Sequence, residues 1–115
     1  MRDIKFRAWN TFHKEMYFFK VGEGYNGLMI DRESIMQFTG LHDKNGKEIY
    51  EGDIVSASIY SDEKPKTLEV YYDNGCFIIE YQDSESDFTP LGWFPSIVEI
   101  IGNIYENPEH ITPKS

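Results

Sequence analysis

This chain has few of the residues that mark a secreted, membrane-bound or redox-active protein. Cys76 is the only cysteine among 115 residues, which excludes a disulfide within the chain and a metal site built from several thiolates. The longest uninterrupted apolar runs span residues 16–19 and 76–79, whereas a membrane-spanning helix needs about 20 apolar residues. The first residues alternate in polarity and contain no apolar signal core. We therefore expect a soluble, cytoplasmic protein with no membrane contact.

Basic side chains are also scarce. The chain has 11 lysines and arginines against 20 aspartates and glutamates, a net charge of −9. An acidic surface repels phosphate backbones, so general nucleic-acid binding is disfavoured. The first 20 residues are the exception, with more basic than acidic side chains. Arg2, Lys5 and Arg7 are the candidate contacts to nucleic acid; the alternative is a solvated strand face that balances the acidic remainder.

No group of residues has the spacing that a catalytic or metal-binding motif requires. The stretch from Asp43 resembles a calcium loop, but Lys47, Glu48 and Ile54 occupy positions where that loop needs an oxygen ligand, a glycine and a glutamate. It is better explained as a hairpin turn. Cys76 has apolar neighbours, which favours a half-buried structural thiol over a nucleophile. We expect no enzymatic activity, no catalytic residue, no cofactor and no metal, with a small hydrolase or metal enzyme as the remaining alternative.

Turn chemistry organises the chain more clearly than helix signals do. The pairs Asn45-Gly46 and Asn74-Gly75 can each supply positive φ at both centres of a type I′ turn, which is the favoured two-residue link of a hairpin. The second pair joins residues 67–72 to a similar run after the turn. We therefore predict a hairpin at each Asn-Gly pair.

Short strands account for most of the remaining pattern. Residues 3–9 alternate apolar and polar side chains, residues 16–19 form a second strand, and residues 102–106 form the last one. Residues 50–55 resemble the entry to an SH3-like barrel, where a glycine permits a sharp bend and an aspartate holds the turn. The predicted fold is mainly β: a small SH3-like barrel with additional N-terminal strands and at most a short helix.

The length supports one domain covering residues 1–115. Within it we place the barrel core at roughly residues 38–107 and a polar tail at 108–115. Aromatic side chains are in excess, at 16% of the chain, and a small barrel cannot bury all of them. Some therefore belong to the core and others to a groove or subunit interface, where Tyr and Trp are favoured. The possible interface aromatics are Tyr71, Tyr72, Tyr81, Trp93 and Phe94.

Three segments resemble the YopX family of phage and prophage proteins. They are IKFRAW at residues 4–9, QFTGLHDKNGKEIYEGDIV at 37–55 and VEIIGNIYENP at 98–108. Together they frame nearly the whole chain, and the central segment is long and specific. One departure is His42, where a lysine is expected.

The resemblance implies an SH3-type barrel with extra elements, a bacteriophage or prophage origin, and assembly into oligomers. It implies no activity, cofactor or catalytic residue, because none is established for the family. We therefore expect a phage or prophage accessory protein that works as a binding or self-assembling module. Its partner would be a host or phage protein or a second copy of the chain. The alternative is a nucleic-acid-binding barrel that uses the basic N-terminal strand.

Overall fold

The computed structural model of the protein describes residues 4–20, 34–58, 65–73, 75–81, 88–93 and 97–110. These residues form two antiparallel sheets, and the first has the strand order β2-β1-β3-β4. Its strands pair in hairpins, except that β3 also pairs with β1 across a longer connection. The strands are β1 (Lys5–Asn10), β2 (Glu15–Lys20), β3 (Met36–His42) and β4 (Glu48–Tyr50).

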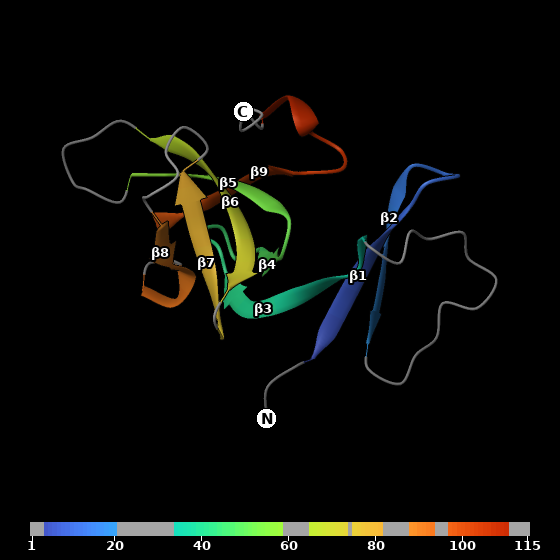
Figure 1. Cartoon of the computed structure of the whole chain (residues 1–115), viewed down its shortest axis with the longest axis horizontal. Helices are drawn as coiled ribbons and strands as arrows, with labels where there is room; N and C mark the ends of the chain where they lie inside the picture. The colour runs from blue at the N-terminus through green and yellow to red at the C-terminus, as the bar shows by residue number, and fades with distance from the viewer. Residues whose placement is uncertain are drawn as a thin grey trace.

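The second sheet has the order β8-β7-β6-β5-β9. It curls around the core as a half-barrel (Figure 1), which is compatible with an SH3-like barrel. The described residues contain no α-helix; two short 3-10 turns, η2 (Leu91–Trp93) and η4 (Pro108–His110), accompany the strands. The mainly β prediction is therefore confirmed. The strands are β5 (Asp53–Ala57), β6 (Lys66–Asp73), β7 (Cys76–Tyr81), β8 (Phe88–Pro90) and β9 (Glu99–Asn103).

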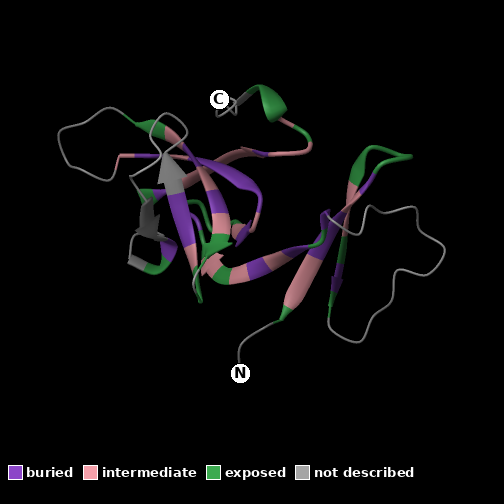
Figure 2. Cartoon of the chain, in the orientation of Figure 1, coloured by how far each residue is buried: buried purple, intermediate pink, exposed green. Residues whose placement is uncertain are grey.

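The molecule divides into an arm and a body. We call the β1–β2 hairpin the arm and the segment from β4 through β9 the body; β3 runs from one to the other (Figure 1). Buried residues concentrate on the body strands (Figure 2). In the described part of the chain, all the buried members of the main apolar cluster belong to the body and none to the arm. These buried members are Ile49, Val55, Ala57, Leu68, Val70, Ile79, Leu91 and Val98.

The two predicted hairpins form, but their turns differ. At Asn74-Gly75, Asp73 pairs directly with Cys76 and Gly75 has a φ of 86°, as a two-residue turn requires; Asn74 lies outside the described residues. At Asn45-Gly46 the type I′ prediction is wrong, because only Gly46 has positive φ. The Gly46 N–H donates to the Asp43 carbonyl, which makes a type I turn followed by a left-handed glycine.

Two further predictions need correction. The last strand is β9, which ends at Asn103, whereas residues 104–106 form a turn rather than a strand. The cause is the Asn103 side chain, whose Oδ1 accepts the N–H groups of Tyr105 and Glu106 and so bends the chain. Cys76 is exposed rather than half-buried. Its position beside a two-residue turn leaves it at the end of the sheet.

Candidate functional site

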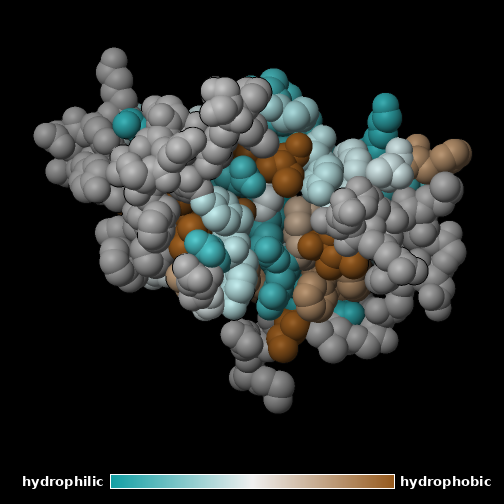
Figure 3. Space-filling view, viewed as in Figure 1, coloured by the Kyte–Doolittle hydropathy of each residue, from teal (hydrophilic) through white to brown (hydrophobic). Residues whose placement is uncertain are grey.

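An open groove of about 680 Å³ lies where the arm meets the body. Its lining comes from five strands: β1 and β2, which form the arm hairpin, and β4, β5 and β9 of the body. On the face seen in Figure 3, hydrophobic side chains lie beside a band of hydrophilic ones near the middle of the molecule. The groove is lined by Arg7, Met16, Phe18, Lys47, Glu48, Tyr50, Asp53, Ile100, Ile101, Gly102, Asn103 and Glu106.

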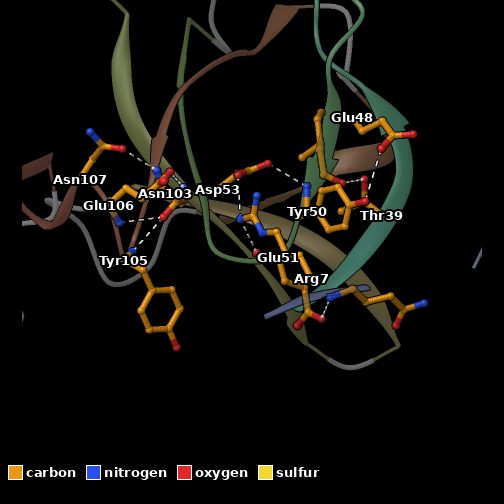
Figure 4. A network of polar contacts seen from close by, with 12 residues as sticks. Arg7, Thr39, Glu48, Tyr50, Glu51, Asp53, Asn103, Tyr105, Glu106 and Asn107 are labelled. Atoms are coloured by element: carbon orange, nitrogen blue, oxygen red, sulfur yellow. Dashed lines mark hydrogen bonds and ion pairs between the residues drawn. The ribbon is translucent and has the colours of Figure 1, made fainter. Parts of the chain in front are cut away.

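A buried ion pair forms the floor of the groove. Arg7 Nη2 on β1 lies 2.8 Å from Asp53 Oδ1 on β5, and both side chains are almost fully buried. The same Nη2 donates to the Glu51 carbonyl at 3.0 Å, and the guanidinium lies over the Tyr50 ring at 4.9 Å from its centroid. Figure 4 shows these groups converging between the arm and the body. One donor of Arg7, Nε, is buried without a partner among the described residues.

The bend between β4 and β5 places Asp53 at this floor. Gly52 has a φ of 83°, which other residues adopt only at a cost. A Cβ there would also lie 2.7 Å from Met36 Sδ, so a larger residue at the bend would require the Met36 side chain to shift. Asp53 then closes the bend, because its Oδ2 accepts the Tyr50 N–H at 2.8 Å. The sharp bend predicted within residues 50–55 is confirmed.

Burial controls the ionisation of both titratable groups on the floor that face Arg7. It raises the pKa of the Asp53 carboxyl above its usual value, although the Arg7 charge and the bond from the Tyr50 N–H oppose the rise. Burial also raises the pKa of Tyr50 to about 12, and the nearby Glu48 carboxylate adds to this rise. The phenol of Tyr50 is therefore neutral at physiological pH, and it meets the arm through a T-shaped contact with Phe18.

The β9 wall is built around two asparagines. Asn103 Nδ2 donates to Glu106 Oε2 at 2.6 Å, which holds this exposed carboxylate at the groove. Asn107 Oδ1 accepts the Asn103 N–H, and it lies so close to Gly102 that a Cβ at that position would clash with it. The turn after β9 is therefore set by side chains that also shape the groove.

The β3–β4 turn fastens the other end of β9. Asp43 Oδ1 accepts the N–H groups of Asn45 and Lys47, while Oδ2 accepts the Ile100 N–H at 3.0 Å. Burial alone would raise the pKa of Asp43, but these three bonds outweigh it and lower the pKa below 3.8. This carboxylate is engaged with backbone groups, as the interpretation of the segment as a hairpin turn requires.

The structure buries one of the predicted nucleic-acid contacts. Arg7 is only 5% exposed and is paired with Asp53, so its guanidinium cannot bind a phosphate unless this buried ion pair breaks. Lys5 is paired with Glu48 and lies over the Phe38 ring. Arg2 lies outside the described residues. The alternation of β1 did not reveal that its basic side chains point toward the body, because alternation fixes two faces but does not tell which face is covered.

Neither of the two predicted interface aromatics whose side chains the structure describes, Tyr71 and Tyr72, lines the groove. Tyr72 is 54% exposed and Tyr71 is half-buried on β6. The side chains of Tyr81 and Trp93, and all of Phe94, lie outside the described part of the chain. The aromatic groups that do line the groove are Phe18 and Tyr50, which the sequence analysis missed. Phe18 is 56% exposed although it stands in the run 16–19, and a continuous apolar run gives no signal for such exposure.

Comparison with known proteins agrees with this fold. The family model described as "YopX protein" matches residues 20–112. The chain belongs to the YopX family. This family consists of phage and prophage proteins whose activity is unknown. None of the helices in the described residues is long and apolar enough to cross a bilayer.

Relatives of known sequence or structure support the assignment. The chain is 33% identical to the SPbeta prophage-derived uncharacterized protein YopX of Bacillus subtilis (strain 168) over 67 residues, which is 56% of this chain and 50% of that protein. The crystal structure of protein EF1440 from Enterococcus faecalis matches with a TM-score of 0.59 and 31% identity, over 95% of this chain and 98% of that one. YopX from B. subtilis matches with a TM-score of 0.56 and 21% identity, over 98% and 99%.

Proposed function

We propose that this YopX-family protein is a non-enzymatic binding module of the bacterial host cytoplasm, and that the groove between arm and body receives a segment of a protein partner. The partner is a host or phage protein, or a second copy of the chain. The observation that carries the proposal is the groove itself, whose volume of about 680 Å³ falls within the roughly 300–1,000 Å³ of ligand-binding sites.

The lining of the groove supports a binding role. Met16 and Phe18 on the arm face Ile101 on the body, while Glu106 and Lys47 supply charges at its margin. Apolar walls with a few placed polar groups are typical of sites that bind by shape. The polar groups on the floor are instead engaged with one another, since Arg7 and Asp53 neutralise each other.

Protein is a better partner than nucleic acid for this surface. The chain carries a net charge of −9, and contacts to a phosphate backbone depend on accessible cations. The buried pairing of Arg7 removes one of the few candidates on the first strand. The acidic character of the rest of the chain would repel the nucleic acid further.

Site-specific photocrosslinking tests the proposal. A photoreactive phenylalanine analogue at Phe18 should give discrete protein adducts in bacteria that carry the prophage, because Phe18 lines the groove. The matched control is the same analogue at Tyr72, which is equally exposed but lies outside the groove. An adduct of twice the chain's mass would identify a second copy as the partner.

Adducts of equal yield and pattern from both positions would contradict a role for the groove. Discrete adducts from Tyr72 alone would instead place the docking surface on β6, where the sequence analysis expected it.

A further inference from the structure

The residues that line the groove indicate the chemistry of the segment that would bind there. Resting on the proposed function, we propose that the occupant is an extended protein segment that places an apolar side chain between Phe18 and Ile101 and a lysine or arginine against Glu106.

The spacing of the arm residues fits an extended segment. Met16 and Phe18 are two positions apart on β2 and both line the groove. Alternate side chains of a strand stand about 7 Å apart, and any other extended chain repeats at the same distance. Alternate side chains of such a segment can therefore pack against this wall in register.

The occupant must bind mainly through its side chains on the β9 side. The outer edge of β9 is already engaged, since the Val98 carbonyl accepts the Lys44 N–H and the Ile100 N–H donates to Asp43. The Asn103 N–H likewise donates to Asn107. Addition of a strand to this edge would break these bonds. The part of β9 left for contact is centred on Ile101, whose side chain is half-buried at the groove wall.

The charges in the groove differ in how far they are satisfied. Arg7 and Asp53 form a pair, and Glu48 is paired with Lys5. Lys47 has no ion-pair partner among the described residues, but its charge helps to lower the pKa of Asp43 nearby.

Among the carboxylates that line the groove, Glu106 is the least satisfied. Asn103 holds its carboxylate in place, and it has no cationic partner among the residues that the structure describes. A partner that approaches a chain of net charge −9 is itself favoured to be basic. A lysine or arginine opposite Glu106 satisfies both conditions.

The experiment is a selection of random dodecapeptides displayed on phage against the immobilised full chain, followed by fluorescence polarisation with the enriched peptides. We expect enrichment of sequences in which lysine or arginine alternates with apolar residues. Substituting Phe18→Ser should weaken their binding at least fivefold, since truncating a central aromatic contact typically costs more than about 1 kcal/mol. Glu106→Gln should weaken it about threefold, as expected for a charge at the margin.

Two matched controls separate this site from general attraction between opposite charges. Glu109→Gln removes the same charge from an exposed position three residues away, and Tyr72→Ser removes an equally exposed ring outside the groove. Neither should alter the affinity. Equal effects of Glu106→Gln and Glu109→Gln would overturn the assignment of the basic side chain.

The outcomes also distinguish this inference from the proposed function. Enrichment of acidic peptides whose binding is lost in Phe18→Ser would overturn the proposed charge of the occupant and leave the groove as a binding site. Enriched peptides that bind Phe18→Ser as tightly as the native chain, or no enrichment at all, would overturn the proposal of a basic and apolar occupant. Peptide binding would then no longer support the groove as a binding site. Circular dichroism of each variant confirms that the fold is retained.

Discussion

The arm and the body are held together by different forces. Among the residues that the structure describes, the body closes around eight buried apolar side chains contributed by its own strands and turns. The arm has no member in that cluster. It meets the body through the Arg7–Asp53 and Lys5–Glu48 pairs and through two ring contacts, Phe18 with Tyr50 and Trp9 with Tyr105. Polar contacts are directional, whereas apolar burial scales with area. The body is therefore the stable unit, and the arm is positioned by a few specific contacts that also create the groove.

The largest expected effect comes from breaking the buried pair between the two regions. Arg7→Met should lower the free energy of unfolding by roughly 3–5 kcal/mol, because it leaves the Asp53 carboxylate buried without a counter-ion. The double variant Arg7→Met/Asp53→Asn should recover most of this loss, because it removes the buried charge while the amide oxygen can still accept the Tyr50 N–H. Urea denaturation measures both. The control is Lys44→Met, which breaks an exposed pair with Glu99 at 3.8 Å and should cost less than about 1 kcal/mol.

If the single and double variants lose the same stability, the arm is held by something other than this pair. Such a result would contradict the view that polar contacts attach the arm whereas apolar burial stabilises the body.

A substitution that leaves a cavity in the body tests whether apolar burial stabilises that region. Leu68→Ala should cost roughly 2–5 kcal/mol, because Leu68 is fully buried in the main cluster. Its effect should reach every strand in native-state hydrogen exchange, since loss of the core lowers global stability. Phe19→Ala, at a buried position in the arm, should weaken protection chiefly in β1 and β2. Uniform loss of protection in both variants would show that arm and body unfold as one unit.

A smaller effect is expected at the turn of the β6–β7 hairpin. Gly75 has a φ of 86° and open space around it, so Gly75→Ala tests backbone strain without a clash. The left-handed conformation costs a residue with a side chain roughly 1–2 kcal/mol. Gly92→Ala is the control, because Gly92 also has open space but lacks positive φ. Equal melting temperatures for the two variants would contradict the strained turn.

The smallest effect concerns Tyr50, which faces both regions. Its pKa rises to about 12 in the folded chain, so the folded state resists its ionisation. Stability from this group is complete below the usual tyrosine pKa of about 10 and is lost as the pH rises toward 12. The loss should reach roughly 1 kcal/mol by pH 11. Tyr50→Phe should remove that part of the alkaline loss, measured as urea stability between pH 8 and 11. Parallel curves for the two proteins would show that Tyr50 is not buried against the arm.

Local sequence was sufficient for β1, β2, the two hairpins and the bend, but not for β8 or for the end of β9. Gly52 and Gly75 indicated positive φ because other residues adopt it only at a cost. The alternation of residues 3–9 predicted β1. The type of the Asn45-Gly46 turn could not be predicted from the local sequence. An Asn-Gly pair permits a type I′ turn. Here, however, one oxygen of Asp43 accepts backbone N–H groups within the turn and the other accepts the distant Ile100 N–H. This long-range bond accompanies a type I turn instead.

The sequence by itself determined a mainly β chain, its acidic charge and its place in the YopX family, because strand alternation, turn glycines and long motifs are local properties. Only the tertiary structure decided that Arg7 is a buried partner of Asp53 rather than a contact for phosphate. It also decided that Phe18 lines a groove. Both outcomes depend on which face of the arm meets the body, and a strand's own alternation is the same whichever face is covered.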